Sequence, residues 1–242
     1  MRGTIWCLHG AVGMAEDWRG FSVPDWGVKR VDLWRFLDCC PMGMAEFGRA
    51  LNGEAAAVAG PKVLLGYSMG GRLALQALLC PGHPWDAAVI VSAHPGLEAH
   101  DERVKRLGAD AEWAAKALSG DWRSFLREWN AQGVLAASGG GAPALELADR
   151  AGLEPRRRPV ARSFVDWSLG AQEPTWTKLG GIACPVLWVV GERDDKFRVL
   201  GGRAVPAGGF EPWLAPGAGH RVPWESAEFP ARVGEFLERV LS

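Results

Sequence analysis

Short apolar runs alternate along the chain with longer segments of helix-like composition. The apolar runs are typical of buried strands, and we predict them at residues 4–8, 29–33, 62–65, 87–92, 185–190 and 210–214. We predict helices at residues 44–58, 71–79 and 225–241. Alternation of strands with helices predicts a mostly parallel sheet that carries helices on both faces.

This alternation stops between residues 94 and 178, where we find no convincing strand. Helix-like segments in that stretch lie at residues 100–107, 111–118, 122–130 and 144–151. Three glycines at residues 139–141 and a proline at position 143 interrupt them. We therefore predict an α/β core formed by residues 1–93 and 179–242, with residues 94–178 inserted as a helical cap.

Composition fits one globular domain and excludes several classes of partner. The chain has 242 residues, of which 48% are hydrophobic and 23% charged. A net charge of −1 gives no electrostatic footprint for nucleic acid, and the apolar runs are too short to cross a bilayer. We therefore expect no nucleic-acid or membrane partner. The five cysteines are odd in number and lack metal-ligand spacing, so we expect free thiols and a cytoplasmic protein.

The sharpest motif is a serine flanked by glycines between a predicted strand and a predicted helix. Residues 66–71 read Gly-Tyr-Ser-Met-Gly-Gly and place Ser68 in this turn. Glycines let strand and helix pass closely, and the helix N-terminus directs free N–H groups at the turn. This context is that of the G-x-S-x-G nucleophile elbow, so we predict the α/β-hydrolase fold with Ser68 as nucleophile.

A serine nucleophile needs a base, and the base needs an acid that orients it. In this fold the order along the chain is serine, acid, histidine. Asp194 and Asp195 both follow the predicted strand 185–190, and His220 follows strand 210–214 after Gly-Ala-Gly. Because parallel strands end at the same edge of a sheet, we expect Ser68, His220 and one of these aspartates to meet there.

Two backbone amides and three arginines extend this predicted site. One oxyanion-hole N–H in this fold comes from the loop after the first strand and one from the residue after the nucleophile, so we assign Ala11 and Met69. Arg72 lies one helical turn beyond the serine and can face the pocket, whereas Arg106 and Arg162 lie in the cap. A cluster of these guanidinium groups would indicate a substrate with several carboxylates.

Narrower motifs give the chain a specific resemblance. They are His-Pro-Gly-Leu at residues 94–97, the arginine after Gly-Gly, and Gly-Glu-Arg-Asp-Asp-Lys-Phe at residues 191–197. With them the chain resembles the 2-succinyl-6-hydroxy-2,4-cyclohexadiene-1-carboxylate synthases of the menaquinone pathway. The family usually has an Asp-x-Pro-Gly-x-Gly loop where this chain reads Asp-Leu-Trp-Arg-Phe at residues 32–36.

The resemblance implies specific roles for residues of this chain. It implies a triad of Ser68, Asp194 and His220, which favours Asp194 over Asp195. It also implies that the substrate is contacted by Tyr67, Arg72, Arg106, Trp129 and Arg162.

The implied reaction is an elimination and not a hydrolysis. Pyruvate leaves 2-succinyl-5-enolpyruvyl-6-hydroxy-3-cyclohexene-1-carboxylate, a small anionic substrate, and neither a metal nor an organic cofactor is needed. Two alternatives stay open: a serine hydrolase of carboxylesters or carbon–carbon bonds, and a non-catalytic ligand-binding relative. The arginines disfavour the first, because simple ester hydrolases prefer apolar pockets. The intact serine, acid, histidine and His-Gly loop disfavour the second.

Overall fold

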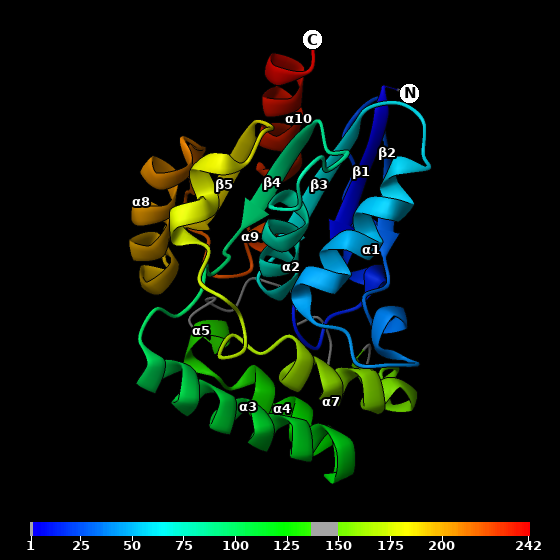
Figure 1. The fold of residues 1–242 in the computed structure, drawn as a ribbon, viewed down its shortest axis with the longest axis vertical. Coiled ribbons are helices and arrows are strands. Elements are labelled where there is room, and N and C mark those ends of the chain that lie inside the picture. The colour runs from blue at the N-terminus through cyan, green and yellow to red at the C-terminus, as the bar shows by residue number, and fades with distance from the viewer. Residues whose placement is uncertain (1, 137–149) are drawn as a thin grey trace.

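The computed structural model describes residues 2–136 and 150–242, and in these residues six strands form one sheet (Figure 1). The strand order is β2-β1-β3-β4-β5-β6, and every neighbouring pair is parallel. The strands are β1 Gly3–Leu8, β2 Trp26–Val31, β3 Lys62–Tyr67, β4 Ala87–Val91, β5 Val186–Gly191 and β6 Glu211–Ala215. The predicted parallel sheet is therefore confirmed, although β2 begins and ends earlier than predicted.

Helices cover both faces of the sheet. Their bounds are α1 Met44–Ala56, α2 Met69–Leu78, α8 Asp195–Gly208, α9 Val222–Glu225 and α10 Phe229–Val240. Alternate side chains of one strand fill the two cores, since successive residues point to opposite faces. In β5, Trp188 packs with the core of α1, α2 and α8, whereas Val189 packs with that of α10. Central strands that are buried on both faces need apolar residues throughout.

Between β4 and β5 the chain forms a layer of helices across the end of the sheet (Figure 1). These helices are α3 His100–Ser119, α4 Trp122–Asn130, α5 Gly133–Ala136 and α7 Arg157–Asp166. Trp122, Phe125 and Phe164 belong to the same buried cluster as α1 and α2, so the layer packs on the sheet core. We keep residues 94–178 as the proposed extent of the cap.

The helices differ from prediction in several places. Residues 100–119 form one helix, where we expected two, and the helix predicted at residues 225–241 is divided into α9 and α10. The short helix α5 and the helices α7 and α8 were not predicted; Pro159 in α7 and the residues Gly201, Gly202 and Pro206 in α8 lower helix propensity. Burial of Phe164, Phe197 and Ala204 overrides that propensity. Most of the helix predicted at residues 144–151, and the glycines at 139–141, lie outside the described residues.

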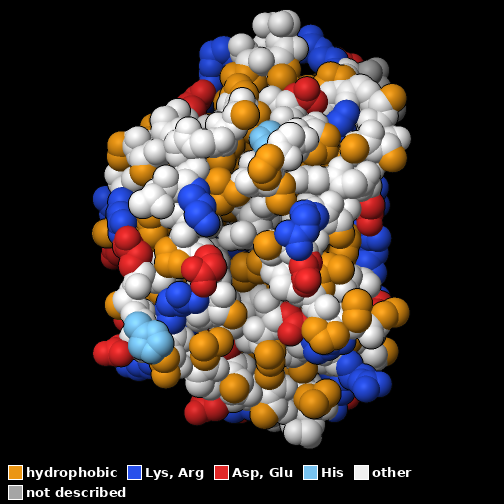
Figure 2. Space-filling model, viewed as in Figure 1, with side chains coloured by type: hydrophobic (Ala, Val, Ile, Leu, Met, Phe, Trp, Pro, Cys, Tyr) orange, Lys and Arg blue, Asp and Glu red, His pale blue; other side chains and the backbone are white. Residues whose placement is uncertain are grey.

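Short 3-10 helices complete the connections. They are η1 Ala15–Gly20, η2 Trp34–Leu37, η3 Glu154–Arg156 and η4 Trp176–Gly181. No helix in residues 2–136 and 150–242 is long and apolar enough to cross a membrane. On the face shown in Figure 2, acidic and basic side chains are interspersed, in keeping with the net charge of −1.

Helix α1 supports the helix that carries the predicted nucleophile, and it does so through a glycine. A Cβ on Gly48 would lie 2.9 Å from the backbone nitrogen of Ala77 in α2, whereas a Cβ on Gly53 would meet nothing within 4 Å. The two positions therefore form a matched pair in one helix.

We expect Gly48→Ala to destabilise the protein by about 1–3 kcal/mol, because the added methyl group overpacks the α1–α2 contact. Gly53→Ala should stabilise it by about 0.5–1 kcal/mol through helix propensity. Urea denaturation measures both changes. Equal stability of the two variants would show that α1 can move away from α2 at no cost.

Candidate active site

The serine motif forms the expected sharp turn between β3 and α2. Ser68 has φ 53° and ψ −112°, a left-handed conformation that costs a non-glycine residue about 1–3 kcal/mol. Its N–H donates to the Val91 carbonyl at 2.9 Å, and its own carbonyl accepts from the Arg72 N–H at 3.0 Å. A Cβ on Gly66 would lie 2.5 Å from the Gly70 carbonyl oxygen. Only glycine fits there, so the turn holds Ser68 at the end of the strand.

The structure brings Ser68, His220 and Asp194 together. His220 Nε2 lies 3.1 Å from Ser68 Oγ, and His220 Nδ1 lies 2.7 Å from Asp194 Oδ2. Both His220 and Asp194 are buried. A carboxylate only accepts hydrogen bonds, so Nδ1 carries the proton and Nε2 is left to accept the proton of Ser68.

Asp194 and Asp195 are separated by their environments. Asp194 caps α8, since its Oδ1 accepts from the Phe197 N–H at 3.3 Å while Oδ2 faces the histidine. The Asp195 side chain is 93% exposed and pairs with Arg198 at 3.2 Å. The geometry therefore places Asp194, and not Asp195, at the acid position.

Contacts between the loops after β5 and β6 fix the histidine. The Arg193 N–H donates to the Ala218 carbonyl at 2.8 Å, and the Glu192 N–H donates to Ala215 at 3.0 Å. Gly191 lies against the backbone of Ala218 and Gly219, with no room for a side chain. The close approach of these two loops sets the separation between acid and histidine.

His9 stiffens the loop that carries Ala11. Its Nδ1–H donates to the Gly10 carbonyl at 2.9 Å, and its Nε2 accepts from the Leu33 N–H at 3.3 Å. Burial lowers the pKa of His9, which keeps the ring neutral and both bonds in place. Ala11 and Met69 line one pocket with Ser68. Leu33 belongs to residues 32–36, which stand where the resembled synthases usually have a glycine-rich loop. This stretch therefore contacts His9 through the Leu33 N–H.

Cationic side chains line this pocket beside the serine. Arg72 and Arg106 lie there as predicted, and Lys196 joins them. Arg72 is 9% exposed and donates to Gln172 Oε1 at 3.2 Å, with no carboxylate oxygen of a described residue within 4 Å. Burial and the charge of Arg106 lower the pKa of Arg72 to about 9. A buried cation without an acid is costly, so this pocket favours an anion.

His94 adds a neutral donor to the same pocket. The Gly96 N–H donates to its Nδ1 at 3.0 Å, so that the proton of the neutral ring sits on Nε2. Burial, followed by the charges of Lys196 and Arg72, lowers the pKa of His94 to about 3. His94 therefore offers an N–H to a ligand without changing charge at physiological pH.

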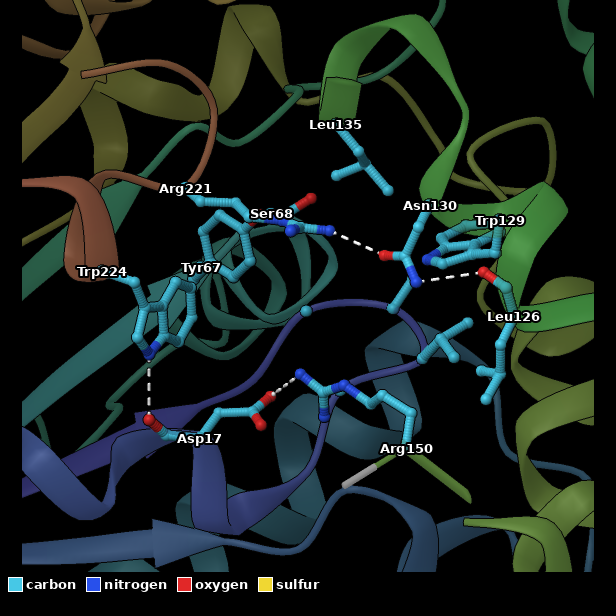
Figure 3. Close-up of a pocket in the computed structure, with 14 residues that line it drawn as sticks. Asp17, Tyr67, Ser68, Leu126, Trp129, Asn130, Leu135, Arg150, Arg221 and Trp224 are labelled. Carbon is cyan, nitrogen blue, oxygen red and sulfur yellow. Dashed lines mark hydrogen bonds and ion pairs between the residues drawn. The ribbon is translucent and has the colours of Figure 1, made fainter. Parts of the chain in front are cut away.

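Tyr67 and Trp129 line a second pocket that also includes Ser68 (Figure 3). Trp129 lines both pockets, whereas Tyr67 lines only the second. The Tyr67 ring packs edge-on against Trp224 at 4.9 Å, and burial raises its pKa. Arg150 lies in this second pocket and pairs with Asp17 at 2.7 Å.

One predicted residue does not reach the site. Arg162 lines neither pocket; it donates to the Leu37 carbonyl at 3.3 Å and pairs with Asp166 at 3.6 Å. Arg150 is the arginine that the C-terminal part of the cap brings near Ser68. No sequence signal distinguished Arg150 from Arg162.

A sequence signal for His94 and Lys196 did exist, because both residues follow strands that end at the predicted edge of the sheet.

The fold agrees with the comparisons with known proteins. Residues 7–235 match the alpha/beta hydrolase family, and the chain belongs to it. A putative 2-succinyl-6-hydroxy-2,4-cyclohexadiene-1-carboxylate synthase of Bacillus subtilis is 28% identical, over 98% of this chain and 91% of that protein. The synthase of Citrobacter koseri is also 28% identical, over 99% and 94% of the two chains. The resemblance inferred from the motifs is therefore confirmed.

Solved structures show the same fold. MenH from S. aureus superposes with a TM-score of 0.82 at 19% identity, covering 100% of this chain and 96% of that one. A thermophilic esterase from Thermogutta terrifontis gives a TM-score of 0.76 at 18% identity, over 100% and 91% of the chains. Proteins with this fold thus include one named as an esterase, so the fold alone does not distinguish elimination from ester hydrolysis. The residues of the pocket must make that distinction.

The neighbouring aspartates provide a test of the acid. We expect Asp194→Asn to slow labelling of Ser68 by a fluorophosphonate about 10³- to 10⁴-fold, since an amide stabilises the wrong histidine tautomer. Asp195→Asn is the control and should label at the wild-type rate. Intact-protein mass spectrometry follows the reaction, and peptide mapping locates the adduct. Equal rates for the two variants, or an adduct on another serine, would refute the assignment.

Proposed function

We propose that this protein eliminates pyruvate from 2-succinyl-5-enolpyruvyl-6-hydroxy-3-cyclohexene-1-carboxylate, giving 2-succinyl-6-hydroxy-2,4-cyclohexadiene-1-carboxylate. The observation that carries the proposal is Arg72, a buried guanidinium in the pocket that contains Ser68, with no carboxylate oxygen of a described residue within 4 Å. Similarity to synthases that carry this name supports it.

The pocket fits an anion with several carboxylates. Arg106 is held through Nε, which donates to Asp110 Oδ1 at 2.8 Å, and Ser168 donates to the other oxygen of that acid at 2.7 Å. This arrangement leaves the terminal nitrogens of Arg106 for a ligand, beside Arg72 and the Nε2–H of His94. Planar guanidinium groups bind carboxylates through two parallel hydrogen bonds. A neutral ester would leave Arg72 buried without a carboxylate from either the ligand or a described residue.

Proton removal begins the proposed reaction. His220, oriented by Asp194, accepts the proton of Ser68, and the serine oxygen takes the ring proton next to the succinyl ketone. Negative charge then develops on the ketone oxygen, which the N–H groups of Ala11 and Met69 stabilise. Loss of one such donor typically costs about 3–4 kcal/mol.

Bond changes in the ring complete the elimination. The electron pair of the broken C–H bond forms a new ring double bond, and the original double bond shifts by one position. The bond between the ring and the enolpyruvyl oxygen breaks, and its electron pair leaves with enolpyruvate. Enolpyruvate then takes a proton and becomes pyruvate, so no water is consumed and atoms balance.

Arg72 distinguishes the elimination from ester hydrolysis. We expect Arg72→Ala to lower kcat/KM for pyruvate release about 10²- to 10³-fold, because a buried charge-assisted contact is worth about 3–4 kcal/mol. Slow hydrolysis of p-nitrophenyl acetate should change by less than about fivefold, since that ester carries no carboxylate. Arg49→Ala removes an exposed arginine and serves as the control.

Both reactions are measured on the wild type and the two variants, with pyruvate coupled to lactate dehydrogenase. Fast ester hydrolysis, absent pyruvate release and an unaffected Arg72→Ala variant together would identify an ordinary serine hydrolase. That result would remove the elimination while leaving the triad in place.

A further inference from the structure

A second pocket adjoins the first at the serine. Both are lined by Ala11, Ser68, Trp129 and Leu135, but their remaining walls differ. Arg72 and Arg106 line only the first pocket, whereas Tyr67, Asn130 and Arg221 line only the second (Figure 3). A ligand whose reacting carbon faces Ser68 can therefore extend an arm into each pocket.

We propose that Arg221 binds a carboxylate arm of the substrate in this second pocket, which Arg72 and Arg106 do not line. This inference rests on the proposed function, because it assumes a substrate with carboxylates on different arms. The substrate proposed above has three, on the succinyl chain, the ring and the enolpyruvyl group.

The position of Arg221 follows from its neighbours in the chain. It comes directly after His220 and precedes α9, so the loop that fixes the histidine also fixes its backbone. Its side chain reaches across the pocket to the cap, where Nη2 donates to Asn130 Oδ1 at 2.9 Å (Figure 3). Asn130 is the last residue of α4 and follows Trp129, which lines both pockets.

Arg221 forms no ion pair with a described residue. Its partner Asn130 is neutral, and no carboxylate oxygen in residues 2–136 and 150–242 lies within 4 Å of its guanidinium group. Arg150, in the same pocket, has Asp17 as a partner at 2.7 Å. Glu225, one turn beyond Arg221, accepts instead from the Gly219 N–H. Arg221 is thus the cation of this pocket that is oriented without being neutralised.

A neutral partner suits a ligand-binding arginine. Asn130 takes one of five N–H donors and holds the plane of the guanidinium group, while the remaining donors are available to a carboxylate. Asn130 is itself fixed, since its Nδ2 donates to the Leu126 carbonyl at 3.0 Å. Replacing this amide by a carboxylate would keep the shape and cancel the charge, which gives a direct test.

The first experiment compares steady-state pyruvate release by four variants. Arg221→Gln should raise KM about tenfold or more with kcat changed less than about threefold, since a contact made equally in ground state and transition state affects KM. Asn130→Asp should raise KM similarly by pairing with Arg221. Asn130→Ala should raise it less, because the charge of Arg221 remains. Arg198→Gln, an exposed arginine on α8, is the matched control and should behave as wild type.

A purely structural latch between loop and cap predicts a different pattern. Asn130→Asp would strengthen such a latch and leave KM unchanged, and Asn130→Ala would have the same effect as Arg221→Gln. Either of these results would overturn the proposal.

The second experiment does not depend on turnover. Binding of tricarballylate, a flexible tricarboxylate, is followed by tryptophan fluorescence, because Trp129 and Trp224 line the pocket. Arg221→Gln should weaken this binding about tenfold or more relative to wild type and Arg198→Gln. If the wild type releases no pyruvate but this dependence holds, the proposed function fails and the carboxylate site stands. If pyruvate is released and neither KM nor tricarballylate binding depends on Arg221, the inference fails and the function stands.

Discussion

The close packing of backbone around Ser68 is the constraint on which the rest of the site depends. A Cβ on Gly70 would lie 2.5 Å from the carbonyl oxygens of Leu8 and His9, so the elbow and the first loop touch through backbone alone. This contact brings Ala11 and Met69 to the same side of the serine. The left-handed conformation of Ser68 is tolerated because hydrogen bonds to β4 and α2 hold both sides of the turn.

The elbow and the loop that carries the acid could be predicted from sequence because their signals are local, whereas the choice of Asp194 over Asp195 came from the family resemblance. Glycines around a serine between a strand and a helix indicate a sharp turn in which the backbones pass closely. The loops that follow parallel strands lie at the same edge of the sheet. The same rule applies to His94 and Lys196, which follow β4 and β5, but neither residue was assigned a role from sequence. The cap could not be predicted in this way. The cap helices are not placed by strand pairing, so the sequence does not show which of their side chains face the pocket. Arg162 instead contacts Leu37 and Asp166. Arg150 lines the second pocket.

Helix α8 was missed for a related reason. Propensity disfavoured helix in α8, which contains three glycines and a proline, yet Phe197 and Ala204 are buried. Tertiary burial decides such segments, and burial is not visible in a single sequence. The error matters for the site, since the first turn of α8 carries Lys196 and is capped by Asp194.

Electrostatics distinguishes this pocket from one built for neutral esters. The basic side chains of Arg72, Arg106 and Lys196 line it together with the neutral His94, and among the described residues only Asp110 forms an ion pair with any of these four. Leaving Arg72 buried without an acid lowers the stability of the empty protein, and an anionic substrate removes that penalty when it binds. In the proposed reaction the carboxylates of the substrate supply the missing negative charge and so contribute binding energy. The proposed triad then removes a proton, and the backbone donors beside it receive the charge that this step creates.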